Sequence, residues 1–225
     1  MGRRNTSKSS KPFRETRKKL KPKTKNQQEY IRAIVESDVT FCTGPAGSGK
    51  TAVAVGLACE YLLEKKVEKI IITRPVVESG GRGLGFLPGT MNEKIQPWLV
   101  PIMEEMNLYL TRDTVNSFRS SNRIELCPLE YMRGRNFHNS FMILDEAQNA
   151  TYDQIKMFLT RIGRESKAIV NGDLDQTDLN KYEGAGLYAC VEKLDQLDGV
   201  SICKLSFEDI IRNSIISKIL TRLQE

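Results

Sequence analysis

Short runs of β-branched and other apolar residues recur along the chain, separated by longer stretches with helical character. The runs predict six strands, at 38–42, 69–73, 123–127, 140–145, 167–173 and 200–205. Helices are predicted between most of them, at 50–64, 91–109, 151–162, 185–196 and 207–223. Strands that alternate with helices are typical of an α/β fold, in which a mostly parallel sheet carries helices on both faces.

The predicted helix at 151–162 carries its own start and stop signals. Thr151 is followed three residues later by Gln154, the pattern of a capping box, and Gly163 follows the last turn. These signals indicate that the helix forms from local sequence as well as from packing.

The composition describes one globular domain. Of 225 residues, 40% are hydrophobic and 28% are charged, and no run approaches the roughly 18 apolar residues of a membrane-spanning helix. The N-terminus lacks the apolar region of a secretory signal. The five cysteines lie far apart without a CxxC pair, which argues against a zinc site and fits a reducing compartment. We therefore expect a cytoplasmic protein that is not bound to membranes.

The charge is concentrated at one end of the chain. Residues 1–25 hold eleven Lys or Arg and a single acid, Glu15, although the whole chain has a net charge of only +6. This composition predicts a flexible basic arm, followed by one domain over residues 26–225. The arm has three interpretations: a solubilising extension, a contact with a nucleic-acid backbone, or a nuclear-localisation signal.

A glycine-rich loop follows the first predicted strand and opens the first predicted helix. Its sequence, GPAGSGKT, fits the P-loop pattern G-x-x-x-x-G-K-[ST], in which backbone N–H groups surround phosphates. Lys50 is expected to reach the β- and γ-phosphates of a nucleoside triphosphate, and Thr51 to ligate Mg²⁺. The predicted nucleotide-binding residues of the loop are Gly44, Pro45, Ala46, Gly47, Ser48, Gly49, Lys50 and Thr51.

Acidic and amide residues follow two later strands. Asp145 and Glu146 end the apolar run at 140–145; Asp145 is expected to hold the Mg²⁺ shell through water, and Glu146 to orient or deprotonate an attacking water. Gln176 follows the strand at 167–173, where it is placed to sense the γ-phosphate while Asp173 shapes the turn. Hydrolysis of the triphosphate is therefore the predicted reaction.

In order along the chain, the P-loop, DEAQ and GDxxQ resemble motifs I, II and III of superfamily-1 helicases. More specifically, residues 24–225 resemble the PhoH-like ATPases, whose core is RecA-like. The resemblance rests on NQQEY (26–30), TRPVVE (73–78), LGFLPG (84–89), EYMRGR (130–135), ILDEAQNAT (143–151), GDLDQTDL (172–179) and DIIRN (209–213).

The resemblance implies roles for residues outside the P-loop. Gln27 matches the glutamine that is taken to read adenine, which implies a preference for ATP. Arg74, in TRP, lies where related helicases contact a nucleic-acid backbone. Arg133 and Arg135 flank Gly134 in a basic turn, a second candidate contact with nucleic acid.

The resemblance also implies a partner copy of the chain. A superfamily-1 helicase binds ATP between two RecA-like domains, and this chain has length for one. Arg212 in DIIRN is therefore expected to reach the γ-phosphate of a neighbouring subunit, in a homo-oligomeric ring and by resemblance a hexamer. The glycine-rich stretch 78–86 would line its hole, with Arg82 touching the phosphates of single-stranded RNA or DNA; a plain flexible connection is the alternative.

Two other functions remain open. A non-motor ATP switch associated with RNA or ribosomes would carry the same motifs. A nucleotide kinase of the thymidine-kinase type also combines a P-loop with DEAQ, but such enzymes resemble zinc proteins with paired cysteines, and Cys190 and Cys203 stand alone. No separate acidic cluster for an RNA-cleaving domain is evident, so we expect no nuclease activity.

Overall fold

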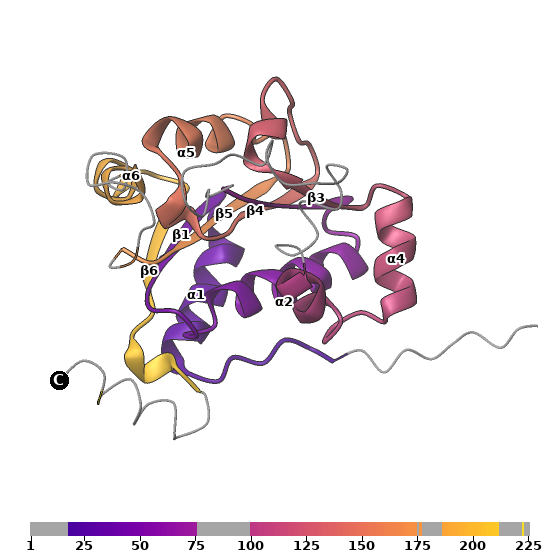
Figure 1. Cartoon of the computed structure of the whole chain (residues 1–225), viewed down its shortest axis with the longest axis horizontal. Coiled ribbons are helices and arrows are strands. Elements are labelled where there is room, and N and C mark those ends of the chain that lie inside the picture. The colour runs from indigo at the N-terminus through magenta and orange to yellow at the C-terminus, as the bar shows by residue number, and fades with distance from the viewer. Residues whose placement is uncertain (1–17, 76–99, 175, 177–185, 212–221, 223–225) are drawn as a thin grey trace, which may run out of the picture.

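The computed structural model describes residues 18–75, 100–174, 176, 186–211 and 222 (Figure 1). These residues form a six-stranded sheet in the order β3-β2-β4-β5-β1-β6, with every pair parallel. The strands are β1 (Val39–Thr43), β2 (Lys69–Arg74), β3 (Ile124–Pro128), β4 (Ser140–Leu144), β5 (Lys167–Gly172) and β6 (Val200–Lys204). All six lie where the apolar runs predicted them, and the α/β fold class is confirmed.

Helices cover both faces of this sheet (Figure 1). Alternate residues of β4 pack on opposite sides: Phe141 and Ile143 join a core with α1, α2 and α4, whereas Met142 and Leu144 join a core with α5 and α6. A strand buried on both faces needs a continuous apolar run, as the sequence of β4 has. The helices are α1 (Lys25–Glu36), α2 (Lys50–Leu63), α4 (Arg112–Ser120), α5 (Tyr152–Leu159) and α6 (Gly186–Leu194).

Two of these helices were not predicted from the sequence. In α1, Gln27, Tyr30 and Ile34 are the buried residues, and in α4 only Val115 is buried. Both segments are mostly polar, so they do not stand out as apolar stretches, although their few apolar residues are spaced on one face of the helix. Both nevertheless begin at a threonine N-cap, a local signal that was available.

The last predicted helix, 207–223, begins differently in the structure. Phe207–Asp209 form a single 3₁₀ turn, η4, and Ile210 and Ile211 are not helical. The Asp209 carboxylate turns back to accept from the Ser206 amide, at 2.7 Å, which closes this turn on itself. Residues 212–221 lie outside the described part. Of the helix predicted at 91–109, residues 100–106 are helical, 107–109 form a turn, and 91–99 are not described.

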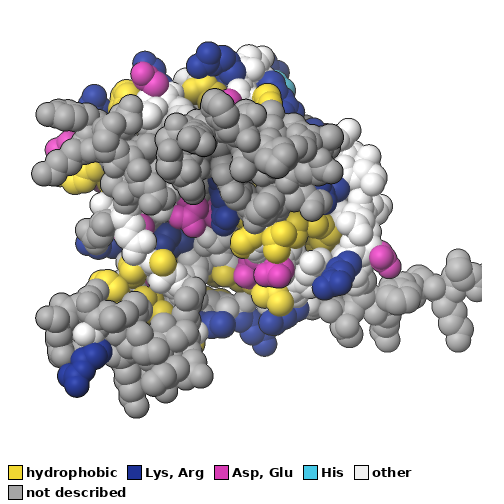
Figure 2. Space-filling model, in the orientation of Figure 1, with side chains coloured by type: hydrophobic (Ala, Val, Ile, Leu, Met, Phe, Trp, Pro, Cys, Tyr) yellow, Lys and Arg dark blue, Asp and Glu magenta, His cyan; other side chains and the backbone are white. Residues whose placement is uncertain are grey.

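The C-terminal part of the basic arm, residues 18–24, packs against the domain. The Leu20 amide donates to Glu60 of α2 at 2.7 Å, the Lys23 amide donates to Gln27 at 2.9 Å, and Thr24 caps α1. The lysines of this segment are exposed, and Figure 2 shows basic side chains along the lower edge of the molecule, where residues 18–24 run. None of the helices in the described ranges is long and apolar enough to cross a membrane.

Candidate nucleotide site

The glycine-rich loop joins the carboxyl end of β1 to the first turn of α2. Gly44 and Gly49 have φ angles of 150° and 96°, values that side chains with a Cβ rarely adopt. At Gly44 an added Cβ would also lie 2.4 Å from the carbonyl oxygen of Leu205. The loop therefore requires glycine at both positions, and the N-terminus of α2 faces the space that it encloses.

Lys50 bends over the loop from the first residue of α2. Its Nζ donates to the carbonyls of Gly44, at 2.5 Å, and Pro45, at 2.9 Å. The Ser48 hydroxyl donates to the same Pro45 carbonyl at 2.8 Å. The lysine charge is thus held at the mouth of the loop, where a phosphate would exchange places with the two carbonyls.

Asp145 connects the loop to β2. The Thr51 hydroxyl donates to Asp145 Oδ1 at 2.8 Å, and Arg74 donates to Oδ2 through Nη2, at 2.6 Å, and Nε, at 3.0 Å. Asp145 is 2% exposed, so its charge needs these partners. Arg74, predicted to contact nucleic acid, is among the residues that line the cavity beside the P-loop, and its contact with nucleic acid stays a prediction.

Glu146 and Gln148 form a second polar group beside Asp145. Glu146 has a φ of 57°, an uncommon backbone conformation for a glutamate, and it precedes η3 (Ala147–Asn149). Its carboxylate accepts from Gln148 Nε2 at 2.6 Å. The side-chain Oε1 of Gln148 accepts from the backbone amide of Asp173 at 3.1 Å. Gln148 therefore links the ends of β4 and β5. Its role was not assigned from the sequence, although it is the last letter of DEAQ.

These residues surround one cavity of about 380 Å³ at the carboxyl ends of the strands. Ligands of open parallel sheets bind at this edge. The structure brings four of the five predicted catalytic residues to this cavity: Lys50, Asp145, Glu146 and Gln176. Thr51, the predicted metal ligand, lines it too, together with Asp173, Arg74 and Glu105.

Gln27, predicted to read adenine, contacts the P-loop in this structure. Its Nε2 donates to the Ser48 carbonyl at 2.9 Å, and its Oε1 accepts from the Lys23 amide. It lies at the boundary of a second cavity, of about 830 Å³, which shares Gly47 and Gly49 with the first. Each of these hydrogen bonds uses one of the two donors or one of the two lone pairs of the amide, and reading of adenine by Gln27 stays a prediction.

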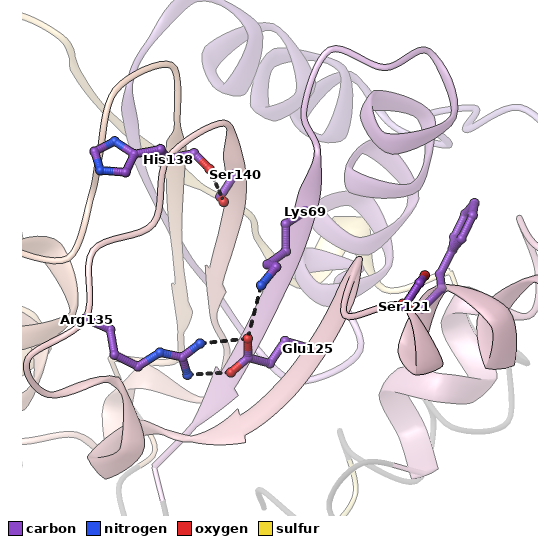
Figure 3. Close-up of polar contacts among 7 residues, drawn as sticks. Lys69, Ser121, Glu125, Arg135, His138 and Ser140 are labelled. Carbon is purple, nitrogen blue, oxygen red and sulfur yellow. Dashed lines mark hydrogen bonds and ion pairs between the residues drawn. The ribbon is translucent and has the colours of Figure 1, made fainter.

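Two other predicted nucleic-acid contacts, Arg133 and Arg135, are not among the described residues that line the cavity. Arg135 forms a bidentate ion pair with Glu125 of β3 (Figure 3). Glu125 also forms an ion pair with Lys69, with 3.6 Å between Lys69 Nζ and Glu125 Oε2. The hydrogen-bonded pair with Arg135 lowers the pKa of the Glu125 carboxyl, against the opposing effect of burial. Arg133 is exposed after the 3₁₀ turn η2 (Leu129–Met132). Arg82 and Arg212 lie outside the described residues.

The residues around Thr51 fit a magnesium ion. Mg²⁺ prefers hard oxygen ligands and is bound in nucleotide sites by one or two protein oxygens together with phosphates and waters. The Thr51 hydroxyl gives its proton to Asp145, so the lone pairs of Oγ1 remain for an ion. The Asp145 carboxylate supplies the charge that holds ion-bound water.

Curated relatives resemble this chain over most of its length. It is 43% identical over 201 residues to a PhoH-like protein of Synechocystis, 43% identical over 203 residues to one of Bacillus subtilis, and 40% identical over 200 residues to Protein PhoH of Escherichia coli. These alignments cover 89%, 90% and 86% of this chain. The chain spans about three fifths of these relatives, with 61%, 63% and 55% of each covered.

A solved structure shares the fold. The large terminase of a thermophilic bacteriophage superposes with a TM-score of 0.59 at 12% identity, over 90% of this chain and 50% of the terminase. A second crystal form of that terminase contains ADP, and superposes with a TM-score of 0.52. The fold is that of RecA-like P-loop proteins. The PhoH-like protein family matches residues 19–224, and the chain belongs to this family.

Proposed function

We propose that this chain is a Mg²⁺-dependent ATPase that acts on single-stranded RNA or DNA as a ring-shaped helicase or translocase in the cytoplasm. One arrangement supports the ATPase most directly: Lys50, Thr51, Asp145 and Glu146 line the same cavity, at the carboxyl edge of a RecA-like sheet. Binding of a nucleotide needs the first three. Glu146 is the group that hydrolysis needs in addition.

The P-loop and Lys50 would bind the phosphates. Lys50 exchanges the Gly44 and Pro45 carbonyls for β- and γ-phosphate oxygens, which carry full negative charge and are stronger acceptors. The first turn of α2 adds its N–H groups and its dipole. Thr51 and Asp145 would hold the magnesium ion, which neutralises charge on the phosphates when bound.

Glu146 would position the attacking water. Its carboxylate lines the cavity and is fixed by Gln148 at 2.6 Å. A carboxylate that accepts a hydrogen bond from water orients the oxygen lone pair and takes the proton as the bond to phosphorus forms. The Gln148 side chain also accepts from the Asp173 amide. A movement of Glu146 would therefore be transmitted through Gln148 to the end of β5, which Gln176 follows in the chain.

Action on nucleic acid is supported by charge and by family membership. Residues 1–25 hold eleven Lys or Arg, which favours contact with a phosphate backbone. Arg133 is exposed, and Arg82 lies in the glycine-rich stretch 78–86. In a head-to-tail hexamer, Arg212 of one subunit would complete the site of the next.

A non-motor switch is the second candidate function. The contact from Glu146 through Gln148 to Asp173 would serve equally to release an RNA or ribosomal partner after hydrolysis. A thymidine-kinase-type enzyme is a third candidate. Transfer of label from ATP to a nucleoside would identify the kinase, and directional unwinding would separate the motor from the switch.

The test is steady-state hydrolysis of ATP by the purified chain, with and without single-stranded RNA or DNA. Lys50→Ala should abolish binding or turnover, and Glu146→Gln should retain ATP while turnover falls at least about 10²-fold. Glu192→Gln, an exposed acid of α6, is the matched control and should behave as the wild type. Normal turnover in Glu146→Gln would overturn this mechanism; turnover indifferent to both polymers would favour the switch.

A further inference from the structure

Arg74 stands at the end of β2 with its guanidinium held inside the nucleotide site. Nε and Nη2 both donate to Asp145 Oδ2, at 3.0 and 2.6 Å, and the side chain is 19% exposed. The same carboxylate accepts the Thr51 hydroxyl through its other oxygen. Arg74 therefore contacts Asp145, which directly precedes Glu146, the residue expected beside the γ-phosphate.

The cavity is poor in positive charge. Among the described residues that line it, Lys50 and Arg74 are the cations, and Glu105, Asp145, Glu146 and Asp173 are the carboxylates. Lys50 approaches from the P-loop side, where it lies on the Gly44 and Pro45 carbonyls. Arg74 approaches from β2 beside Asp145, so the two cations reach the cavity from different elements.

We propose that Arg74 contacts the terminal phosphate in cis, and that it neutralises charge in the transition state from within each chain, in addition to the Arg212 that a neighbouring subunit would supply. This inference rests on the proposed ATPase function. An arginine has five N–H donors in a planar fork, so it can keep Asp145 and donate to a phosphate oxygen at once. A lysine, with its single charged nitrogen, cannot reproduce that geometry.

The reaction itself is hydrolysis, and it balances without a further reactant. The oxygen of water bonds to the γ-phosphorus, the bond from phosphorus to the β–γ bridging oxygen breaks, and ADP leaves with that electron pair. Glu146 takes the proton of the water and returns it to the products. Arg74 takes no part in the proton transfer, and its hydrogen bonds to the phosphate strengthen as negative charge develops there.

The decisive measurement is binding and not turnover alone. We would measure the affinities of ADP and of ADP with aluminium fluoride, a mimic of the transferred phosphoryl group, for the wild type, Arg74→Ala and Arg74→Lys. The preference for the mimic should fall about 10²-fold or more in both variants, and the ADP affinity by less than about threefold. Arg119→Ala, an exposed arginine of α4, is the matched control and should keep the preference.

Loss of Arg74 also leaves the buried Asp145 without its ion pair, so Arg74→Ala is expected to lose stability for that reason alone. Arg74→Lys keeps a positive charge beside Asp145. If its melting temperature is near the wild-type value, its preference for the mimic decides the question without Arg74→Ala. An unchanged preference for the mimic in Arg74→Lys would overturn the proposal and leave Arg74 as a support for Asp145. A wild type that binds both ligands but does not hydrolyse ATP would instead refute the ATPase function.

Mixing subunits separates a cis from a trans arginine. Chains with Arg74→Ala are combined with chains carrying Lys50→Ala. If Arg74 acts in cis, neither kind of chain holds a complete site, and the mixture stays inactive. Recovered turnover would mean that Arg74 of one chain serves the site of another, which would overturn the proposal.

Discussion

At the scale of single residues, the site depends on groups that each serve two neighbours. Asp145 accepts both Thr51 and Arg74, and Gln148 donates to Glu146 while accepting from Asp173. Such shared contacts fix several functional side chains with few residues. A substitution of Asp145 or Gln148 would therefore disturb two functional side chains at once.

Gly44 and Gly134 test the backbone requirement of the P-loop. Both have positive φ, but a Cβ at Gly44 would lie 2.4 Å from the Leu205 carbonyl oxygen, whereas at Gly134 nothing lies within 4 Å. Gly134→Ala should cost about 1 kcal/mol of unfolding free energy, from φ alone. Gly44→Ala should cost about 3 kcal/mol or more, because the backbone must also move. Urea unfolding measures both, and equal losses would contradict the role assigned to the close contact.

Glu125 gives the fold a defined acid sensitivity. Arg135 holds its pKa below the ordinary value, so in mild acid the unfolded chain binds a proton that the folded chain does not. The stabilisation is therefore complete above the unfolded pKa, about 4.3, and is lost as the pH falls through the folded pKa. At pH 7, Glu125→Gln should lose about 1 kcal/mol, a modest value because Arg135 is partly exposed.

The measurement is urea unfolding of the wild type and Glu125→Gln from pH 7 down to pH 3. The difference between them should shrink below about pH 4.3. A difference that stays constant with pH would show that the carboxylate charge is not what stabilises the fold at this position.

At the scale of elements, the two ends of the described domain are joined through Asp209. This residue of η4 is 2% exposed and accepts from Thr24, the N-cap of α1, and from Asn26 at 2.9 Å, besides the Ser206 amide. The start of α1 and the turn after β6 are thus fixed together, beside the second cavity that both of them line.

Asp209→Ala should destabilise the domain by about 2 kcal/mol, because it leaves the half-buried donors of Thr24, Asn26 and Ser206 without their acceptor. For a chain of this size the melting temperature should fall by about 4–8 °C. Glu208→Ala, an exposed residue of the same turn, is the control and should change it by less than about 2 °C. Calorimetry compares the three proteins, and equal melting temperatures would show that the two elements are held by apolar packing alone.

At the scale of the whole molecule, the basic arm divides into two parts. Residues 18–24 pack through Leu20 and cap α1 through Thr24, whereas residues 1–17 lie outside the described structure and hold six Lys or Arg with one Glu. A deletion of the whole arm therefore removes structure as well as charge.

Deletion of residues 1–17 should leave the melting temperature within about 2 °C of the wild type. It should lower the affinity for nucleic acid and make that affinity less dependent on the salt concentration. Deletion of residues 1–24 should also lower the melting temperature by several degrees, since the Thr24 cap and the Leu20 contacts are lost. Binding of a labelled single strand at several salt concentrations tests the first statement. An unchanged salt slope in the shorter deletion would assign the contact to the domain itself.

Local sequence determined much of this protein. Apolar runs located all six strands, of which the central β1, β2, β4 and β5 are largely buried. The P-loop could be identified because its backbone needs glycine at fixed positions. The capping box at Thr151 formed as expected, with both of its hydrogen bonds present. Family membership followed from motifs that keep their order along the chain.

The tertiary structure decided what depends on distant contacts. Arg74 and Asp145 are 71 residues apart, and only the pairing of β2 with β4 brings the arginine beside this carboxylate in the cavity. Thr24 and Asp209, 185 residues apart, meet only because β6 pairs with β1 beside α1. The helices α1 and α4 are mostly polar, with few buried residues each, and were not predicted from the apolar runs. Patterns in sequence report burial and backbone conformation, which are local, whereas the partners of a charged side chain are set by the order of strands in the sheet.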